Sequence, residues 1–154
     1  MPDKLRWLLG IVTLSIGLGG CTPPPTAPLS FTTTQLAREP MDALLESVKK
    51  VGLYPAIVNP GIVETRWEET LHVGEPLEEK KTKLVRRYVV RIEKRAFGSI
   101  VTIETQAKRC VLATVRFGES EVEGQCAPVP TLPPPLLAEL NHTADRLEKL
   151  LSIP

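Results

Sequence analysis

The chain contains little of the chemistry on which most enzymes depend. It has 2 histidines among its 154 residues, and neither His72 nor His142 is followed by a histidine or cysteine at the spacing of a zinc site. A phosphate-binding glycine loop and a nucleophile-elbow motif are also missing. Asp145 follows His142 by three residues, a pair that we interpret as a surface hydrogen bond. We therefore expect a non-enzymatic protein with no metal and no cofactor.

Aromatic side chains and long apolar runs are scarce as well. Aromatic residues make up 5% of the chain, so a hydrophobic core must rest on leucine, valine and isoleucine. The apolar run at residues 7–18 is too short to cross a bilayer as a permanent helix. Basic and acidic side chains number 19 and 18, a balance that gives no reason to expect a nucleic-acid partner.

What the N-terminus does contain is a secretion signal. Lys4 and Arg6 precede the apolar run, and residues 18–21, with the sequence LGGC, follow it directly. This arrangement resembles the lipobox of bacterial lipoproteins. The resemblance implies that residues 1–20 are a signal peptide, and that Cys21 becomes the lipidated first residue of the mature chain. The alternative is an ordinary secreted protein in which Cys21 is an odd thiol.

The residue after Cys21 bears on whether the lipoprotein stays in the inner membrane or moves to the outer membrane. In the lipoproteins that this chain resembles, an Asp at that position favours retention in the inner membrane, and here it is Thr22. We therefore expect a lipid anchor in the outer membrane with the protein facing the periplasm, the inner membrane and the cell surface being the alternatives. Several acyl chains together make such attachment stable.

Residues 21–38 have the composition of a tether. Prolines crowd residues 23–28, where the backbone cannot pair regularly and favours extended polyproline II. With residues 29–38 added, this segment could hold a folded domain tens of ångströms from the bilayer. The remaining residues, 39–154, are enough for one small domain.

Hydrophobic periodicity divides that domain into helices and strands. Pro40 opens a helix whose apolar positions recur through residues 41–51, and Gly52 ends it. A second helix follows the prolines at 133–135, with Leu137, Leu140, Ala144, Leu147 and Leu151 predicted to share one face. Between them alternation predicts strands at residues 53–58, 62–69, 83–94, 100–107 and 111–117. Residues 97–99, which include Gly98, are expected to form a turn, and residues 70–81 and 118–124 polar loops.

This order of elements predicts an α+β fold. Antiparallel strands with one apolar face need a cover, and two amphipathic helices supply it. We expect a small antiparallel sheet covered by both helices in a helix-grip-like sandwich, with residues 29–34 as a further edge strand.

Two cysteines remain once Cys21 is assigned to the lipid. In an exported protein, Cys110 and Cys126 are expected to form a disulfide. Two buried free thiols are the alternative. The close spacing that activates redox-active cysteine pairs is absent.

Basic residues dominate the two central strands, while acidic residues flank them. One interpretation is that acidic and basic strands pair across the sheet. The other is that Arg87, Arg91 and their neighbours form a surface for an anionic partner, such as lipopolysaccharide phosphates or an acidic protein.

The order of elements, with the segment GIVETRW at residues 61–67, resembles the domain of BamC-type lipoproteins. These are accessory subunits of the outer-membrane β-barrel assembly machinery, often with two such domains where this chain has room for one. The resemblance implies a scaffolding subunit of an envelope complex. A similar case exists for LptE-type lipoproteins of lipopolysaccharide export, which would imply a lipid-binding or lipopolysaccharide-binding protein. A cell-wall hydrolase is disfavoured because no catalytic constellation is present.

Overall fold

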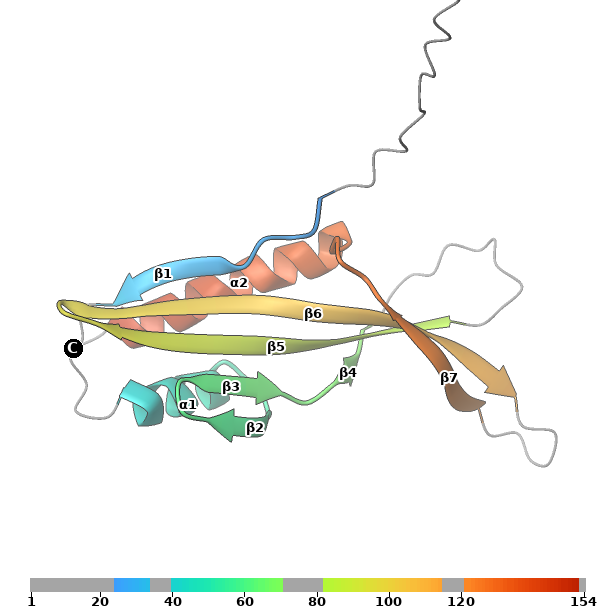
Figure 1. Ribbon diagram of the computed structural model, residues 1–154, viewed down its shortest axis with the longest axis horizontal. Coiled ribbons are helices and arrows are strands. Elements are labelled where there is room, and N and C mark those ends of the chain that lie inside the picture. The colour runs from blue at the N-terminus through green and yellow to red at the C-terminus, as the bar shows by residue number, and fades with distance from the viewer. Residues whose placement is uncertain (1–23, 34–39, 71–81, 115–120, 153–154) are drawn as a thin grey trace, which may run out of the picture.

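The computed structural model describes residues 24–33, 40–70, 82–114 and 121–152. The elements in chain order are β1 (Leu29–Thr33), α1 (Pro40–Lys50), β2 (Pro55–Asn59), β3 (Ile62–Thr65), β4 (Glu68–Glu69), β5 (Thr82–Arg95), β6 (Gly98–Thr114), β7 (Glu121–Pro128) and α2 (Pro134–Ser152). The predicted α+β class is confirmed: seven strands form one sheet, and both helices lie on the same side of it, behind the strands in Figure 1.

The sheet is antiparallel and is organised around one long hairpin. Its strand order is β1-β6-β5-β3-β2, with β4 on β5 and β7 on β6. Gly98, at φ 122°, closes the β5–β6 turn, because this backbone conformation is open to glycine and strained for other residues. Strands β1 and β7 share the outer edge of β6, β1 near the hairpin tip and β7 at the opposite end.

The core lies between the sheet and the helices. Leu44 and Val48 of α1 and Leu140 and Leu147 of α2 are fully buried. They pack with apolar residues from one face of the sheet, among which Val63, Tyr88, Val90, Val101 and Ile103 are fully buried. As predicted, the first helix ends at Gly52, whose φ is 88°.

The apolar face of α2 differs from the prediction by one position. Leu136, and not Leu137, is buried together with Leu140, Ala144, Leu147 and Leu151, while Leu137 is 38% exposed. Neighbouring helical residues point about 100° apart, so only one of two adjacent leucines can join the stripe. Leu136 lies four residues before Leu140 and therefore shares its face of the helix.

The strands also differ from the prediction in three places. The strand expected at residues 62–69 is interrupted between β3 and β4, and the strands expected at 100–107 and 111–117 belong to one continuous strand, β6, as far as Thr114. Residues 115–117 of the expected strand lie outside the described residues. The turn expected at 118–124 contributes its last four residues to β7. Lys108 and Arg109, which separate the two expected strands, both pair with β5, opposite Val85 and Leu84. Pairing with β5 therefore continues β6 through these charged residues, of which Arg109 is exposed.

Residues 24–33, expected to belong to the tether or to an edge strand, are part of the folded domain. The edge strand predicted at residues 29–34 is present as β1, which pairs with β6. Before it, Thr26 N–H donates to the Pro130 carbonyl at 2.9 Å, and the Thr131 hydroxyl donates to the Pro24 carbonyl at 2.9 Å. Leu132 N–H in turn donates to the Thr26 hydroxyl at 2.8 Å. The folded domain therefore begins by residue 24. Thr26 supplies the backbone N–H donor that the neighbouring prolines lack, and its hydroxyl accepts a further hydrogen bond.

Candidate functional site

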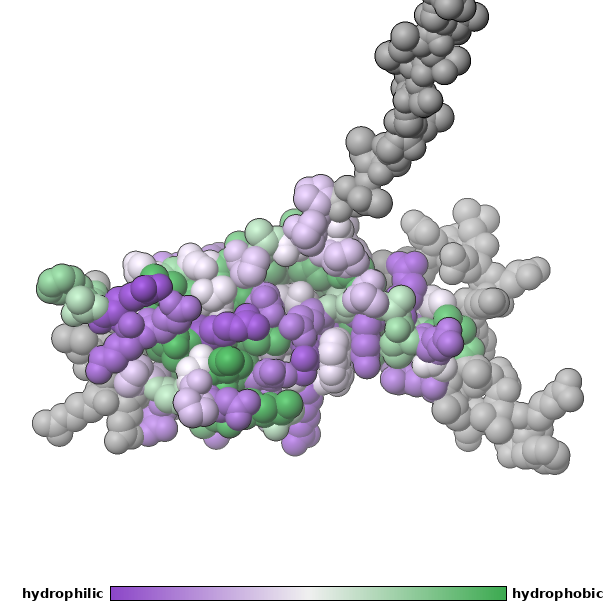
Figure 2. Space-filling view, in the orientation of Figure 1, coloured by the Kyte–Doolittle hydropathy of each residue, from purple (hydrophilic) through white to green (hydrophobic). Residues whose placement is uncertain are grey.

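The open face of the sheet, on the side away from the helices, carries most of the polar chemistry. Side chains alternate along β5, so Arg87 and Arg91 point to this face and Tyr88 and Val90 to the core. Figure 2 looks onto the side opposite the helices and shows a band of hydrophilic side chains over apolar ones. Two apolar residues of this face, Val85 and Val89, are nevertheless buried, at 4% and 1% exposure.

The arginines predicted to attract an anionic partner are paired within the sheet. Arg87 forms an ion pair with Glu64 of β3 and donates to the side-chain oxygen of Gln106 at 2.9 Å. Arg91 pairs with Glu104 of β6 at 3.2 Å. The structure thus has the cross-strand pairing that was one of the two interpretations of this charge pattern. A partner anion at Arg87 or Arg91 must compete with a carboxylate that is already in place.

A cavity of 370 Å³ lies beside these pairs, between Trp67 and the chain that follows β7. The residues that line it are Trp67, Thr105, Gln106, Ala107, Lys108, Cys126, Pro128, Val129 and Pro130. Its walls are mainly apolar, and Lys108 is the only charged residue among those described residues that line it. Few polar groups on an apolar concave surface are typical of small-ligand sites of this size.

Trp67 is the central side chain of this site. It is 40% exposed, and two cations lie over its ring: the Lys108 ammonium at 4.5 Å and the Arg87 guanidinium at 4.9 Å from the ring centre. Such contacts hold a tryptophan at a water-exposed site by attraction between the cations and the ring electrons. The break between β3 and β4 is what places Trp67 here, and the alternation pattern did not indicate that break. Lys108 is one of many basic residues in the central strands, and nothing in the local pattern distinguishes it from the others.

The predicted disulfide joins Cys110 of β6 to Cys126 of β7, with the sulfurs 2.06 Å apart. The two residues are directly opposite in the strand register. The bond closes one wall of the cavity, because Cys126 is among its lining residues.

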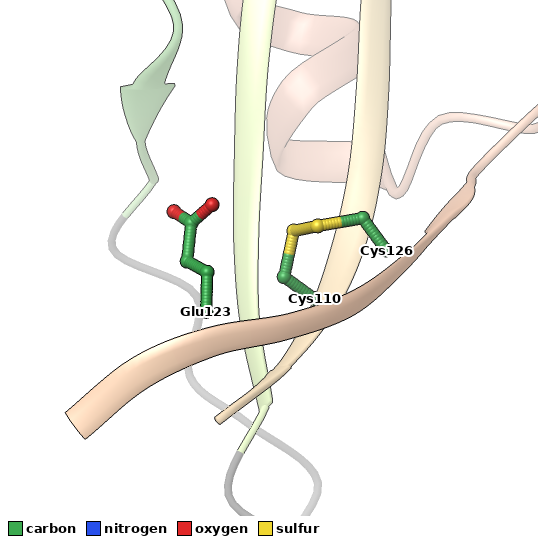
Figure 3. A group of neighbouring side chains, drawn as sticks. All are labelled: Cys110, Glu123 and Cys126. Carbon is green, nitrogen blue, oxygen red and sulfur yellow. A yellow bond between two sulfur atoms is a disulfide. The ribbon is translucent and has the colours of Figure 1, made fainter. Parts of the chain in front are cut away.

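Glu123 lies next to this disulfide, as Figure 3 shows. Its carboxylate and the two sulfurs are within 4.8 Å of one another, a cluster with the ligand types of a metal site. A thiol must be free to become the thiolate that binds a metal, so the disulfide form does not offer this site. Glu123 forms an ion pair with Lys83 instead, and the hydrogen bond from Lys83 lowers the pKa of Glu123 and raises the pKa of Lys83.

A second cavity, of 330 Å³, lies where the start of α2 meets β4 and β5. Arg86 lines this cavity and forms ion pairs with Glu68 at 3.2 Å and with Glu139 of α2. Its guanidinium also lies 4.8 Å from the centre of the Tyr88 ring. Because both carboxylates neutralise this arginine, we interpret the cluster as a clamp that fixes α2 to the sheet.

The remaining sequence-predicted residues are placed as follows. Cys21 and His72 lie outside the described residues. His142 and Asp145 are both exposed on α2, and no hydrogen bond joins them in the described part of the chain. No helix within the described ranges has the length and apolar character needed to cross a membrane.

Models of known protein families were compared with the chain, and none matches; a search of curated proteins finds no match either.

Proposed function

We propose that this protein is a non-enzymatic lipoprotein, anchored through Cys21, that serves as an accessory or scaffolding subunit of an envelope complex of the outer-membrane assembly type. The LGGC sequence at residues 18–21 supports the anchor. The observation that carries the scaffolding role is the apolar surface of β2.

Strand β2 is the last strand on its side of the sheet, and its apolar side chains are exposed. Tyr54, just before the strand, is 62% exposed, and Ile57 and Val58 are 45% and 49% exposed. The sequence of the strand, PAIVN, carries no charge, although charges are a common protection of edge strands. An uncharged edge with exposed apolar side chains is suited to a protein partner that adds a strand or an apolar patch.

Affinity capture of the full chain from detergent-solubilised envelopes tests this role. We expect the wild-type protein to bring down subunits of a barrel-assembly or secretion complex. The double variant Ile57→Lys/Val58→Lys should lose them, because two lysines oppose burial of the edge. The matched control, Ser30→Lys/Thr32→Lys on the opposite edge strand β1, should retain them. Capture of no such complex by the wild type would contradict the scaffolding role.

A second candidate function is binding of an anionic lipid, lipopolysaccharide among them. The cavity at Trp67 favours it, because an apolar wall and one cation match a lipid that bears an acid group. Lipid extracted from the same captured sample should contain the bound species, and Lys108→Glu should reduce its amount. Arg91→Glu should leave it unchanged, because Arg91 is paired with Glu104 and does not line the cavity.

A further inference from the structure

The N-terminal end of the domain is fastened next to the Trp67 cavity. We define the N-terminal seam as Pro24, Thr26, Pro130, Thr131 and Leu132, which the three hydrogen bonds described above join together. Pro130 belongs to both features: its carbonyl accepts the bond from Thr26, and it lines the cavity. The seam and the cavity are therefore neighbours on one region of the surface.

The seam limits how far the domain can stand from a lipid on Cys21. Only three peptide units separate Cys21 from Pro24, and a fully extended chain covers at most about 3.5 Å per residue, or about 10 Å in total. A free tether over residues 21–38 would have allowed several times this distance. The seam thus holds the neighbouring surface at the level of the lipid headgroups.

The chemistry of the cavity matches that location. The Lys108 ammonium suits a phosphate, while Pro128, Val129, Pro130 and the Trp67 ring suit hydrocarbon. Glu123 forms its ion pair with Lys83, and the charge of Lys108 is the weakest of the influences on its carboxylate. Tryptophan and lysine at the boundary of a bilayer are also the residues whose side chains combine an apolar body with a polar end.

We propose that the anchored domain rests on the bilayer through the N-terminal seam, and that the Trp67–Lys108 cavity binds an anionic phospholipid of the same membrane. This arrangement rests on the proposed lipid anchor at Cys21. It makes the bilayer itself the ligand reservoir, so the lipid reaches the cavity without leaving the membrane.

The fluorescence of Trp67 can be used to test this arrangement. Of its 2 tryptophans, Trp7 lies within the proposed signal peptide, so Trp67 is the single tryptophan of the mature protein. The lipidated full-length mature protein is reconstituted into vesicles whose phospholipids carry brominated acyl chains, which quench tryptophan fluorescence on contact. We expect strong quenching with brominated phosphatidylglycerol and weaker quenching with brominated phosphatidylcholine, because only the former offers a net negative headgroup to Lys108.

Two matched pairs of variants separate the cavity from the seam. Lys108→Glu should reduce the phosphatidylglycerol-dependent quenching by about fivefold or more, the effect of one basic residue at an anionic membrane. Lys94→Glu, on β5 near the hairpin tip, should not reduce it. Thr26→Pro removes two of the three seam bonds and should lower the quenching in both kinds of vesicle, whereas Ala27→Pro, at an exposed neighbouring position, should not.

The outcomes distinguish this inference from the proposed function. An intact mass without lipid on Cys21 removes the anchor, and with it the proposed function. A lipidated protein whose Trp67 is not quenched in either vesicle overturns the membrane-resting arrangement while the anchor stands. Equal quenching in both vesicles, unaffected by Lys108→Glu, overturns the anionic phospholipid as the occupant of the cavity.

Discussion

On the helix-covered face of the sheet, β5 places Tyr88 and Val90 against α1 and α2, and both are fully buried in the main core. On the open face, its Val85 and Val89 are almost as buried, yet they lie outside that core and beneath no helix. Arg87, which forms an ion pair with Glu64, lies between them in β5 on the same face. On the first face the burial comes from apolar packing against the helices. On the second the two valines lie opposite charged residues of the neighbouring strands, whose long side chains have apolar stems.

This difference separates stability from function in the molecule. The helix-covered face supplies the apolar burial that stabilises the domain. The open face holds the paired charges, the disulfide and the Trp67 cavity. We therefore expect substitutions in the core of the first face to destabilise the protein most, and substitutions of the polar side chains on the second face to change binding with little loss of stability.

The largest effect is expected in the core. Leu140→Ala should lower the free energy of unfolding by about 3–5 kcal/mol, because the removed side chain is fully buried and leaves a cavity. The control on the same helix is Leu137→Ala, at a site that is 38% exposed, which should cost less than about 1 kcal/mol. Urea denaturation followed by circular dichroism measures both. Equal losses would mean that the apolar face of α2 is wrongly assigned.

The second-largest loss of stability is expected on removal of the disulfide. Replacing Cys110 and Cys126 together by alanine opens a loop whose ends are 16 residues apart, for an expected loss of about 3 kcal/mol by the loop-entropy model. Denaturation with and without reductant checks this value in the wild-type protein. The double variant should be insensitive to reductant. A wild-type midpoint that reductant does not change would contradict the contribution of the bond to stability.

Val89 and Val90 are adjacent in β5 and point to opposite faces of the sheet, so the same substitution at each compares the packing of the two faces. Val90→Ala should cost about 2–3 kcal/mol because its cavity lies in the close-packed core. Val89→Ala, buried to the same degree on the open face, should cost about 1–1.5 kcal/mol because flexible polar side chains can close over the gap. The measurement is again chemical denaturation. A larger loss at Val89 would show that the open face is packed as rigidly as the core.

The smallest effect concerns pH. Burial raises the pKa of Tyr88, and this effect outweighs the nearby positive charge of Arg86, which lowers it. Because the folded-state pKa lies above the unfolded one, its contribution to stability is complete below about pH 10 and is lost as the pH rises through the folded-state value. Tyr88→Phe should therefore flatten the decline in unfolding free energy above pH 10, whereas Tyr54→Phe, at an exposed position, should follow the wild type.

Several parts of the fold could be read from local patterns. Pro40 and Gly52 mark the ends of the first helix, and Gly98 marks the tip of the central hairpin, because these residues restrict or free the backbone on their own. The pairing of Cys110 with Cys126 followed from count and compartment. Each inference depended on chemistry contained within one residue or a short segment.

The candidate site could not be found in this way. Trp67 and Lys108 are 41 positions apart in the chain, and they meet because β4 and β6 both pair with β5. The seam joins residues about 105 positions apart in the same manner. No periodicity encodes such contacts, because they depend on strand order and register rather than on alternation.

By itself, the sequence determined the α+β class, the helix ends, the hairpin turn and the cysteine pair, since backbone preference and hydrophobic period act locally. Only the tertiary structure decided that Arg87 and Arg91 are paired, that the proline-rich segment begins the domain, and that Trp67 lies over a cavity with Lys108. The physical reason is that side chains distant in sequence compete for the same partners, and that competition is resolved only when the strands are brought together.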